Sequence, residues 1–104
     1  MKELIEKVIK FRDDRNWKQF HTPENLSKSI VLEAAELLEN FQWNNDYKLE
    51  NVKEELADIF IYSILLADQL KVDLVEIAHE KLEKNKEKYP VEKAYGSSKK
   101  YNKY

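Results

Sequence analysis

The stretch EELADIFIYSILLA, residues 54–67, decides the fold of this chain. From Ile59 onward, apolar side chains occupy nearly every position around a helix. A helix that is apolar on all sides is usually buried at the centre of a helical protein. We therefore predict a central helix from about Leu49 to Leu70, covered by other helices.

The composition agrees with an all-α fold. Only one Gly and two Pro occur among 104 residues, whereas Glu, Lys, Leu and Ala are abundant, which favours long helices over a turn-rich sheet. The hydrophobic content of 42% is enough for one modest core. We expect a single domain, residues 1–104, with no room for a second catalytic module.

Two helices are predicted before the central one. Apolar residues recur at helical spacing from about Glu3 to Asn16. Thr22 followed by Pro23 is an N-cap with proline at the first helical position, and it opens a helix that reaches about Phe41. With one helix after the central one, these elements form a four-helix bundle.

Polar residues and prolines indicate where the predicted helices begin and end. Residues 17–21 form a predicted loop, and the polar run Asn44–Asp46 is predicted to end the second helix. Asp73 with Glu76 resembles a capping box that opens the fourth helix, which ends before Pro90.

The charge is distributed unevenly along the chain. Residues 1–70 hold 9 basic and 14 acidic side chains, whereas residues 71–104 hold 9 basic and 6 acidic ones. The net charge of −2 gives no general basic footprint for nucleic acid. The Lys- and Tyr-rich tail, residues 91–104, is expected to be either a loose arm or a segment that a partner or ligand orders.

Several classes of protein are excluded by simple features. The chain has no Cys, so it forms neither disulfides nor thiolate metal sites. The longest apolar run, residues 59–67, is far shorter than the ~18 residues of a membrane span, and the N-terminus mixes charges from the start. We expect a cytoplasmic protein that binds neither membrane nor nucleic acid.

Two pairs of acids carry the chemistry. Glu33 and Glu36 lie on the second predicted helix, and Glu55 and Asp58 on the third, each pair three residues apart. Residues with this spacing are neighbours on one helix face, so two facing helices can present four carboxylates to one point. All-oxygen ligation of this kind suits Mg²⁺ or Mn²⁺.

The surroundings of these acids strengthen the metal hypothesis. No Lys or Arg occurs in residues 30–46 or 55–69, so local cationic partners are missing. Clustered carboxylates repel one another and have raised pKa values unless a cation compensates them. Glu33 lies at the rim of an apolar arc and Asp58 directly precedes the apolar run, so both are expected to be partly buried.

Two other interpretations of the acids exist. They could be a solvated helix face, as most single Glu residues in a highly charged chain are. Alternatively, Glu76 and His79 form an ExxH pair of the kind found in ferritin-like di-iron centres. That fold needs two such pairs, and the other histidine, His21, lies in a predicted loop.

These residues resemble the MazG-like branch of the all-α nucleoside triphosphate pyrophosphatases, which carries ExxE and ExxD on successive helices. The resemblance covers nearly the whole chain and is strongest to the dCTP pyrophosphatase group. Beyond the acids it extends to the following segments: RNWKQFH at 15–21, FQW at 41–43, DIFIY at 58–62, the run 81–90 and GSSKKY at 96–101.

The resemblance implies a role for each matching position. It implies that Glu33, Glu36, Glu55 and Asp58 bind Mg²⁺ and carry catalysis. It also implies that the nucleotide is bound by the following residues: Trp17, Trp43 and Tyr62 for the base, and Lys81, Asn85 and Lys88 for the phosphates. Some relatives that cleave dCTP have a histidine where this chain has Val8. This difference affects the expected base selectivity but not the expected metal chemistry.

The implied reaction is the hydrolysis of a nucleoside triphosphate to the monophosphate and pyrophosphate. The expected substrate is dCTP or a related pyrimidine nucleotide. Metal ions would activate the water, or Glu36 could act as a general base. The alternative function is a non-catalytic, dimeric helical interaction module whose acids only keep it soluble.

An oligomer is predicted from the third helix. Three amphipathic neighbours in so short a chain do not easily cover a helix that is apolar on all sides. A second copy of the chain is the simplest cover, with Ile61 and Leu65 in the shared surface, and it would give a homodimer or a homotetramer.

Overall fold

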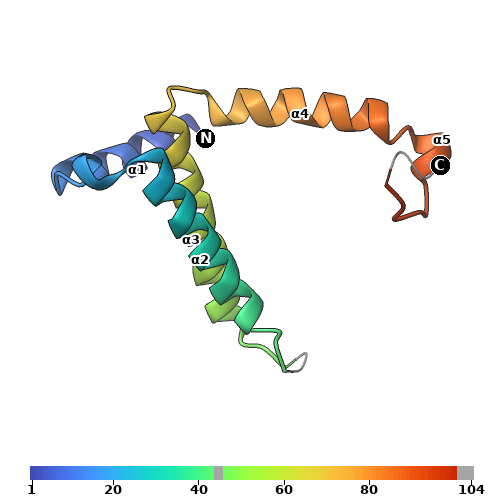
Figure 1. The fold of residues 1–104 in the computed structure, drawn as a ribbon, viewed down its shortest axis with the longest axis horizontal. Helices are drawn as coiled ribbons and strands as arrows, with labels where there is room; N and C mark the ends of the chain where they lie inside the picture. Colours follow the sequence, from blue (N-terminus) through green and yellow to red (C-terminus); the bar gives the residue numbers. More distant parts are fainter. Residues whose placement is uncertain (44–45, 101–104) are drawn as a thin grey trace. The chain divides into compact units, whose positions relative to one another are not determined.

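The chain is all-α in the computed structural model, which describes residues 1–43 and 46–100 (Figure 1). Four long helices and no strand occur in these two ranges. The long helices are α1 (Lys2–Asp14), α2 (Pro23–Glu39), α3 (Leu49–Gln69) and α4 (Leu74–Lys88). The all-α class predicted from the composition is therefore confirmed.

Two short helices lie in segments without a predicted helix. The 3-10 helix η1 (Lys18–Phe20) occupies most of the predicted loop 17–21. The helix α5 (Val91–Ala94) lies in the tail, directly after Pro90, so the beginning of the tail has regular structure of its own. Asn44 and Asn45, which were predicted to end the second helix, lie outside the described residues.

The start of α2 is capped as predicted. The Thr22 side chain accepts a hydrogen bond from the Asn25 backbone N–H at 3.1 Å, and Pro23 occupies the first helical position. This cap satisfies one of the backbone donors that a helix N-terminus leaves free.

Residues with positive φ end α1 and α3. Asn16 has φ 55°, and the Trp17 N–H then bonds to the Arg12 carbonyl at 3.1 Å. Lys71 has φ 59°, and the Val72 N–H bonds to the Ala67 carbonyl at 3.0 Å. Both patterns are Schellman-type ends, which satisfy the last carbonyls of a helix.

The chain forms two compact units. The N-terminal unit, Met1–Asp73, contains α1, α2 and α3, and the C-terminal unit, Leu74–Tyr104, contains α4 and α5. In the N-terminal unit, α2 runs alongside α3 in the opposite direction (Figure 1). Helix α1 packs against α3 as well.

The core of the N-terminal unit lies where the three helices meet. Leu26 of α2 and Ile64 of α3 are each 1% exposed, and Val8 of α1 is buried with them. Leu65 is also buried in this unit, so it is not free to form the shared surface that the sequence assigned to it. Among the described residues, no helix is both long enough and apolar enough to cross a membrane.

Candidate active site

Three of the predicted acids meet between α2 and α3. One carboxylate oxygen from each of Glu33, Glu55 and Asp58 lies within 4.8 Å of the others. Glu33 comes from α2 and the other two from α3, so the antiparallel packing of these helices brings the two pairs of acids together. Three of the four acids in the predicted pairs therefore lie together, and their role in metal binding stays a prediction.

The cluster contains buried charge without a protein cation. Among the described residues, Glu33 Oε2 and Glu55 Oε2 are buried and have no hydrogen-bond partner, and none of the ion pairs of these residues involves the three acids. A buried, unpaired carboxylate oxygen is costly. A bound cation would remove this cost, so the donor set fits a hard divalent metal ion.

Glu36 lies beside this trio. A hydrogen bond that a protonated Glu36 shares with Glu55, together with the negative charge of Glu55, raises the pKa of Glu36. In the same way, a hydrogen bond shared with Glu33 is the main cause of the raised pKa of Glu55. The four acids therefore interact as one group, as expected for clustered carboxylates without a cation.

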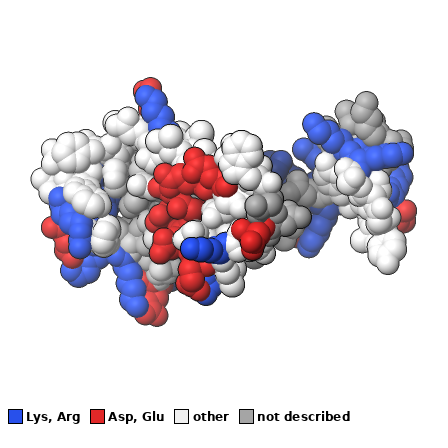
Figure 2. All heavy atoms as spheres, turned by 90° about the horizontal axis from the view of Figure 1, so that it is seen from below, with Lys and Arg blue, Asp and Glu red and all other residues white. Residues whose placement is uncertain are grey.

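One of the acids, Asp58, is less buried than the sequence predicted. Glu33 is half-buried as expected, but Asp58 is exposed. Asp58 precedes the apolar run in sequence, yet a helix turns by about 100° per residue, so adjacent residues face different directions. Figure 2 shows that acidic side chains gather in one patch on the face of the N-terminal unit turned to the viewer.

A pocket adjoins the acidic cluster in the N-terminal unit. Its volume is about 370 Å³, within the range of small-molecule sites. Its apolar and aromatic lining consists of Val8, Phe11, Trp17, Ile61, Tyr62 and Leu65. Its polar lining consists of Lys7, Arg12, His21 and Asp58. Asp58 thus belongs to both the pocket and the acidic cluster, which makes the two features one continuous site.

Of the three aromatic residues predicted to bind the base, two line this pocket and one does not. Trp17 and Tyr62 line it, and the Trp17 ring makes an edge-to-face contact with Phe11 at a centroid distance of 5.6 Å. Trp43 does not line this pocket and is 85% exposed. The structure thus brings two of the three predicted aromatics to the site in the N-terminal unit.

The predicted phosphate-binding residues belong to the C-terminal unit. Lys81, Asn85 and Lys88 all lie on α4, with Asn85 half-buried and the two lysines exposed. Lys81 also borders an open hollow along α4 together with Leu74 and Ile77. The spacing of four and then three residues places the three side chains on one face of α4.

Three polar residues of the pocket, Lys7, Arg12 and His21, were not predicted from the sequence, and two of them are buried in part or in full. Arg12 is only 2% exposed although it is charged, and His21 has a buried Nδ1 without a hydrogen-bond partner among the described residues. The sequence does contain a signal for Arg12, because it follows Val8 by one helical turn on the apolar face of α1. His21 carries no comparable signal, since it lies in a connecting segment.

The chain is similar to known proteins over most of its length. The model of the MazG-like family matches residues 28–103. The chain is 38% identical to dCTP pyrophosphatase 1 of Mus musculus over 88% of its own length and 59% of that protein. It is 39% identical to dCTP pyrophosphatase 1 of Bos taurus, of which it spans 60%. It thus spans about three fifths of the length of these relatives.

A solved structure has the same fold. A pyrophosphatase from Archaeoglobus fulgidus DSM 4304 superposes with a TM-score of 0.80 and is 41% identical in sequence. The match covers 86% of this chain and 92% of the archaeal one. At this level of identity, the likeness concerns sequence as well as fold.

Proposed function

The chain belongs to the MazG-like family, and from this premise we propose that it is a Mg²⁺-dependent nucleoside triphosphate pyrophosphohydrolase. The single observation that carries the proposal is the trio Glu33, Glu55 and Asp58, whose oxygens lie within 4.8 Å of one another. The dCTP pyrophosphatase relatives support the reaction class. Water would attack the α phosphorus, and the products would be the nucleoside monophosphate and pyrophosphate.

Glu33, Glu55 and Asp58 would hold the metal ion, with Glu36 beside them. When bound, Mg²⁺ neutralises charge on the phosphate oxygens and makes the attacking water more acidic. The preference for Mg²⁺ over softer metals rests on the donor set, which consists of carboxylate oxygens only.

Glu36 is the best candidate for the general base. It lies outside the trio that would hold the metal and directly beside Glu55, so its carboxylate is placed to accept a proton from water at the site. In this role, Glu36 takes the proton that the attacking water loses. A positioned general base typically contributes about 10² to 10⁴ in rate.

The pocket beside Asp58 suits the nucleobase. Trp17 and Tyr62 offer aromatic surface, and stacking on an aromatic ring is worth roughly 1–3 kcal/mol per base. A pyrimidine deoxynucleotide such as dCTP is the proposed substrate, in line with the named activity of the relatives. Trp43 is a proposed second stacking surface, and this role rests on the family resemblance alone.

The stripe of Lys81, Asn85 and Lys88 suits the phosphates. The two lysine ammonium groups and the NH₂ group of the Asn85 amide lie on one face of α4. All of them can donate hydrogen bonds to phosphate oxygens. We infer a role in phosphate binding from this stripe.

We also propose that the working unit is a homodimer or a homotetramer. Several apolar side chains of α2 and α3 are exposed in the N-terminal unit, among them Val31, Leu38 and Leu56, which are 66%, 68% and 58% exposed. A second copy of the chain would cover these side chains, since large exposed apolar surfaces mark interaction sites. Light scattering is expected to give a mass of at least two chains, and a fully active monomer would contradict this part of the proposal.

Turnover tests the proposed function. The purified chain with dCTP and millimolar Mg²⁺ is expected to release pyrophosphate, and a chelator such as EDTA should abolish the release. If none of the common nucleoside triphosphates is hydrolysed, the proposed function is wrong and a non-catalytic interaction module becomes the better explanation.

A further inference from the structure

Arg12 is an unusual residue to find in the lining of a pocket, because it is charged and yet buried. It lies on α1 among the residues that line the 370 Å³ pocket beside Asp58, and it is 2% exposed. A charged side chain is seldom buried to this extent unless it is paired.

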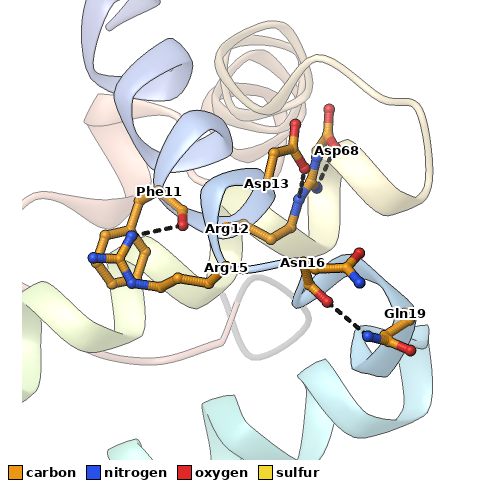
Figure 3. A network of polar contacts seen from close by, with 7 residues as sticks. All are labelled: Phe11, Arg12, Asp13, Arg15, Asn16, Gln19 and Asp68. Carbon is orange, nitrogen blue, oxygen red and sulfur yellow. Dashed lines mark hydrogen bonds and ion pairs between the residues drawn. The ribbon is translucent and has the colours of Figure 1, made fainter.

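Two carboxylates hold the Arg12 guanidinium in place. Nε donates to Asp13 Oδ1 at 2.9 Å, and Nη1 donates to Asp68 Oδ2 at 2.6 Å (Figure 3). Asp68 belongs to α3, so the second bond joins two helices. These bonds fix the orientation of the side chain, because a guanidinium is planar and its N–H groups point in set directions.

The same two carboxylates compensate the charge of Arg12. Burial opposes the charged form, but the hydrogen bonds to Asp13 and Asp68 and their negative charges outweigh burial and raise the pKa of Arg12. Since one positive charge faces two negative ones, the Arg12 guanidinium has no uncompensated charge of its own to attract a phosphate. Arg12 is therefore better suited to a neutral group of the ligand.

The guanidinium still has donors to offer. It carries five N–H groups and cannot accept a hydrogen bond. Its two bonds within the described part of the chain use two of these groups. Only a small part of Arg12 is exposed, and an acceptor on a ligand that fills the pocket would complete the hydrogen bonding of the guanidinium there.

His21 adds a second polar group to this part of the pocket. It lines the pocket, and its Nδ1 is buried without a partner among the described residues. Most of the rest of the lining is apolar or aromatic, and Lys7 and Asp58 are the other polar residues. An apolar and aromatic lining with a few placed polar groups is typical of small-molecule sites, and aromatic side chains can stack on a nucleobase.

From this arrangement we propose that Arg12 is a specificity-determining residue that donates a hydrogen bond to a carbonyl oxygen of the nucleobase. The inference rests on the proposed function, because it takes the pocket to hold the base. Pyrimidine bases carry a carbonyl oxygen at C2, whereas adenine carries none. The site thus selects carbonyl-bearing bases, and pyrimidines fulfil this requirement in the smallest volume.

The test compares dCTP with 2-thio-dCTP, in which sulfur, a weaker acceptor, replaces the carbonyl oxygen at C2. Dissociation constants are measured by calorimetry with Ca²⁺, and turnover is measured separately with Mg²⁺.

The variants are Arg12→Met, the double variant Arg12→Met with Asp68→Met, and the control Lys10→Met. The double variant keeps the test valid if Arg12→Met alone does not fold, because apolar pairs often replace buried ion pairs without loss of stability. Lys10 is exposed, lies on the same helix and pairs only with Asp14 among the described residues.

Wild type and Lys10→Met are expected to bind dCTP about tenfold more tightly than 2-thio-dCTP. The Arg12 variants should lower this ratio below about twofold, mainly through weaker binding of dCTP. If the role of Arg12 is purely structural, the variants lower the affinity for both nucleotides equally and leave the ratio of the two dissociation constants unchanged. That result would overturn the inference. Equal affinities in wild type would overturn it too. An absence of turnover would count against the proposed function, while the binding ratio would still decide the role of Arg12.

Discussion

Glu33 of α2 and Glu55 of α3 meet in one cluster, and each has a buried carboxylate oxygen without a hydrogen-bond partner in the described part of the chain. Such a pair is unfavourable in a metal-free protein, because like charges repel and burial penalises both. In the proposed metal site, a bound cation offsets this cost, and the stability of the fold should therefore depend on divalent cations.

Thermal unfolding with and without Mg²⁺ should show this dependence. A ligand that binds only the folded state stabilises it by about 2.7 kcal/mol at a hundred times its dissociation constant, so millimolar Mg²⁺ is expected to raise the melting temperature by several degrees. Glu55→Gln should remove most of this shift. The control Glu50→Gln changes an exposed acid of α3 that pairs with Lys53, and it should keep the shift. An equal shift in both variants would contradict the metal assignment.

Glu36→Gln should separate stability from activity. Removing one charge relieves the repulsion by Glu55, so the metal-free variant is expected to unfold at a higher temperature than wild type. Turnover of dCTP should fall by about 10² or more, because the general base is lost. Glu24→Gln, at an exposed position of the same helix that pairs with Lys28, serves as the control and should change neither property. A Glu36→Gln variant with near-normal turnover would rule out the assigned role.

Trp17 and Trp43 should contribute unequally to substrate binding. Trp17 lines the pocket beside Asp58, whereas Trp43 is 85% exposed and lies outside it. Loss of one stacking ring costs roughly 1–3 kcal/mol, so Trp17→Ala is expected to raise the KM for dCTP about tenfold or more. Trp43→Ala should have a smaller effect. If Trp17→Ala leaves the KM for every nucleotide unchanged, the base does not bind in this pocket.

His21 should make the stability depend on pH below neutrality. Burial, and secondarily the charge of Arg12, lowers the pKa of His21 from its usual value of 6.5. The unfolded chain then binds a proton at a higher pH than the folded chain, so the free energy of unfolding falls as the pH drops below about 6.5 and through the folded pKa. Urea unfolding between about pH 7.5 and pH 5 measures this slope.

The variant His21→Gln is expected to flatten this slope, since the proton-binding group is gone. His79→Gln removes the other histidine, which is exposed on α4, and provides the matched control. A slope that is identical in wild type and His21→Gln would show that His21 does not couple folding to protons.

Much of the fold could be predicted because local signals decide it. The Thr22 and Pro23 pair marks the start of α2, and the apolar run after Asp58 marks α3. The paired acids were predictable for the same reason, since spacing on a helix fixes which side chains are neighbours. Their meeting needed only that α2 and α3 pack side by side, which is common for helices joined by a short connection.

The rest of the site depends on contacts between distant segments. Arg12 and Asp68 are 56 positions apart, and no local pattern pairs them. Trp17 and Trp43 both lie beside helix ends in the sequence, so only the packing of α1 on α3 shows which of them lines the pocket. Asp58 was predicted to be partly buried but is exposed, because its place beside the apolar run in the sequence does not fix the direction in which it points from the helix.

The most direct test of the account is the fate of the water oxygen during hydrolysis of dCTP. The chain, with Mg²⁺ and dCTP in water enriched in ¹⁸O, is followed by ³¹P NMR. We expect dCMP and pyrophosphate in equal amounts, with the ¹⁸O label in dCMP only, and no reaction after removal of the metal with EDTA. Formation of dCDP and orthophosphate, a label in pyrophosphate, or turnover that persists without a divalent metal would contradict the account.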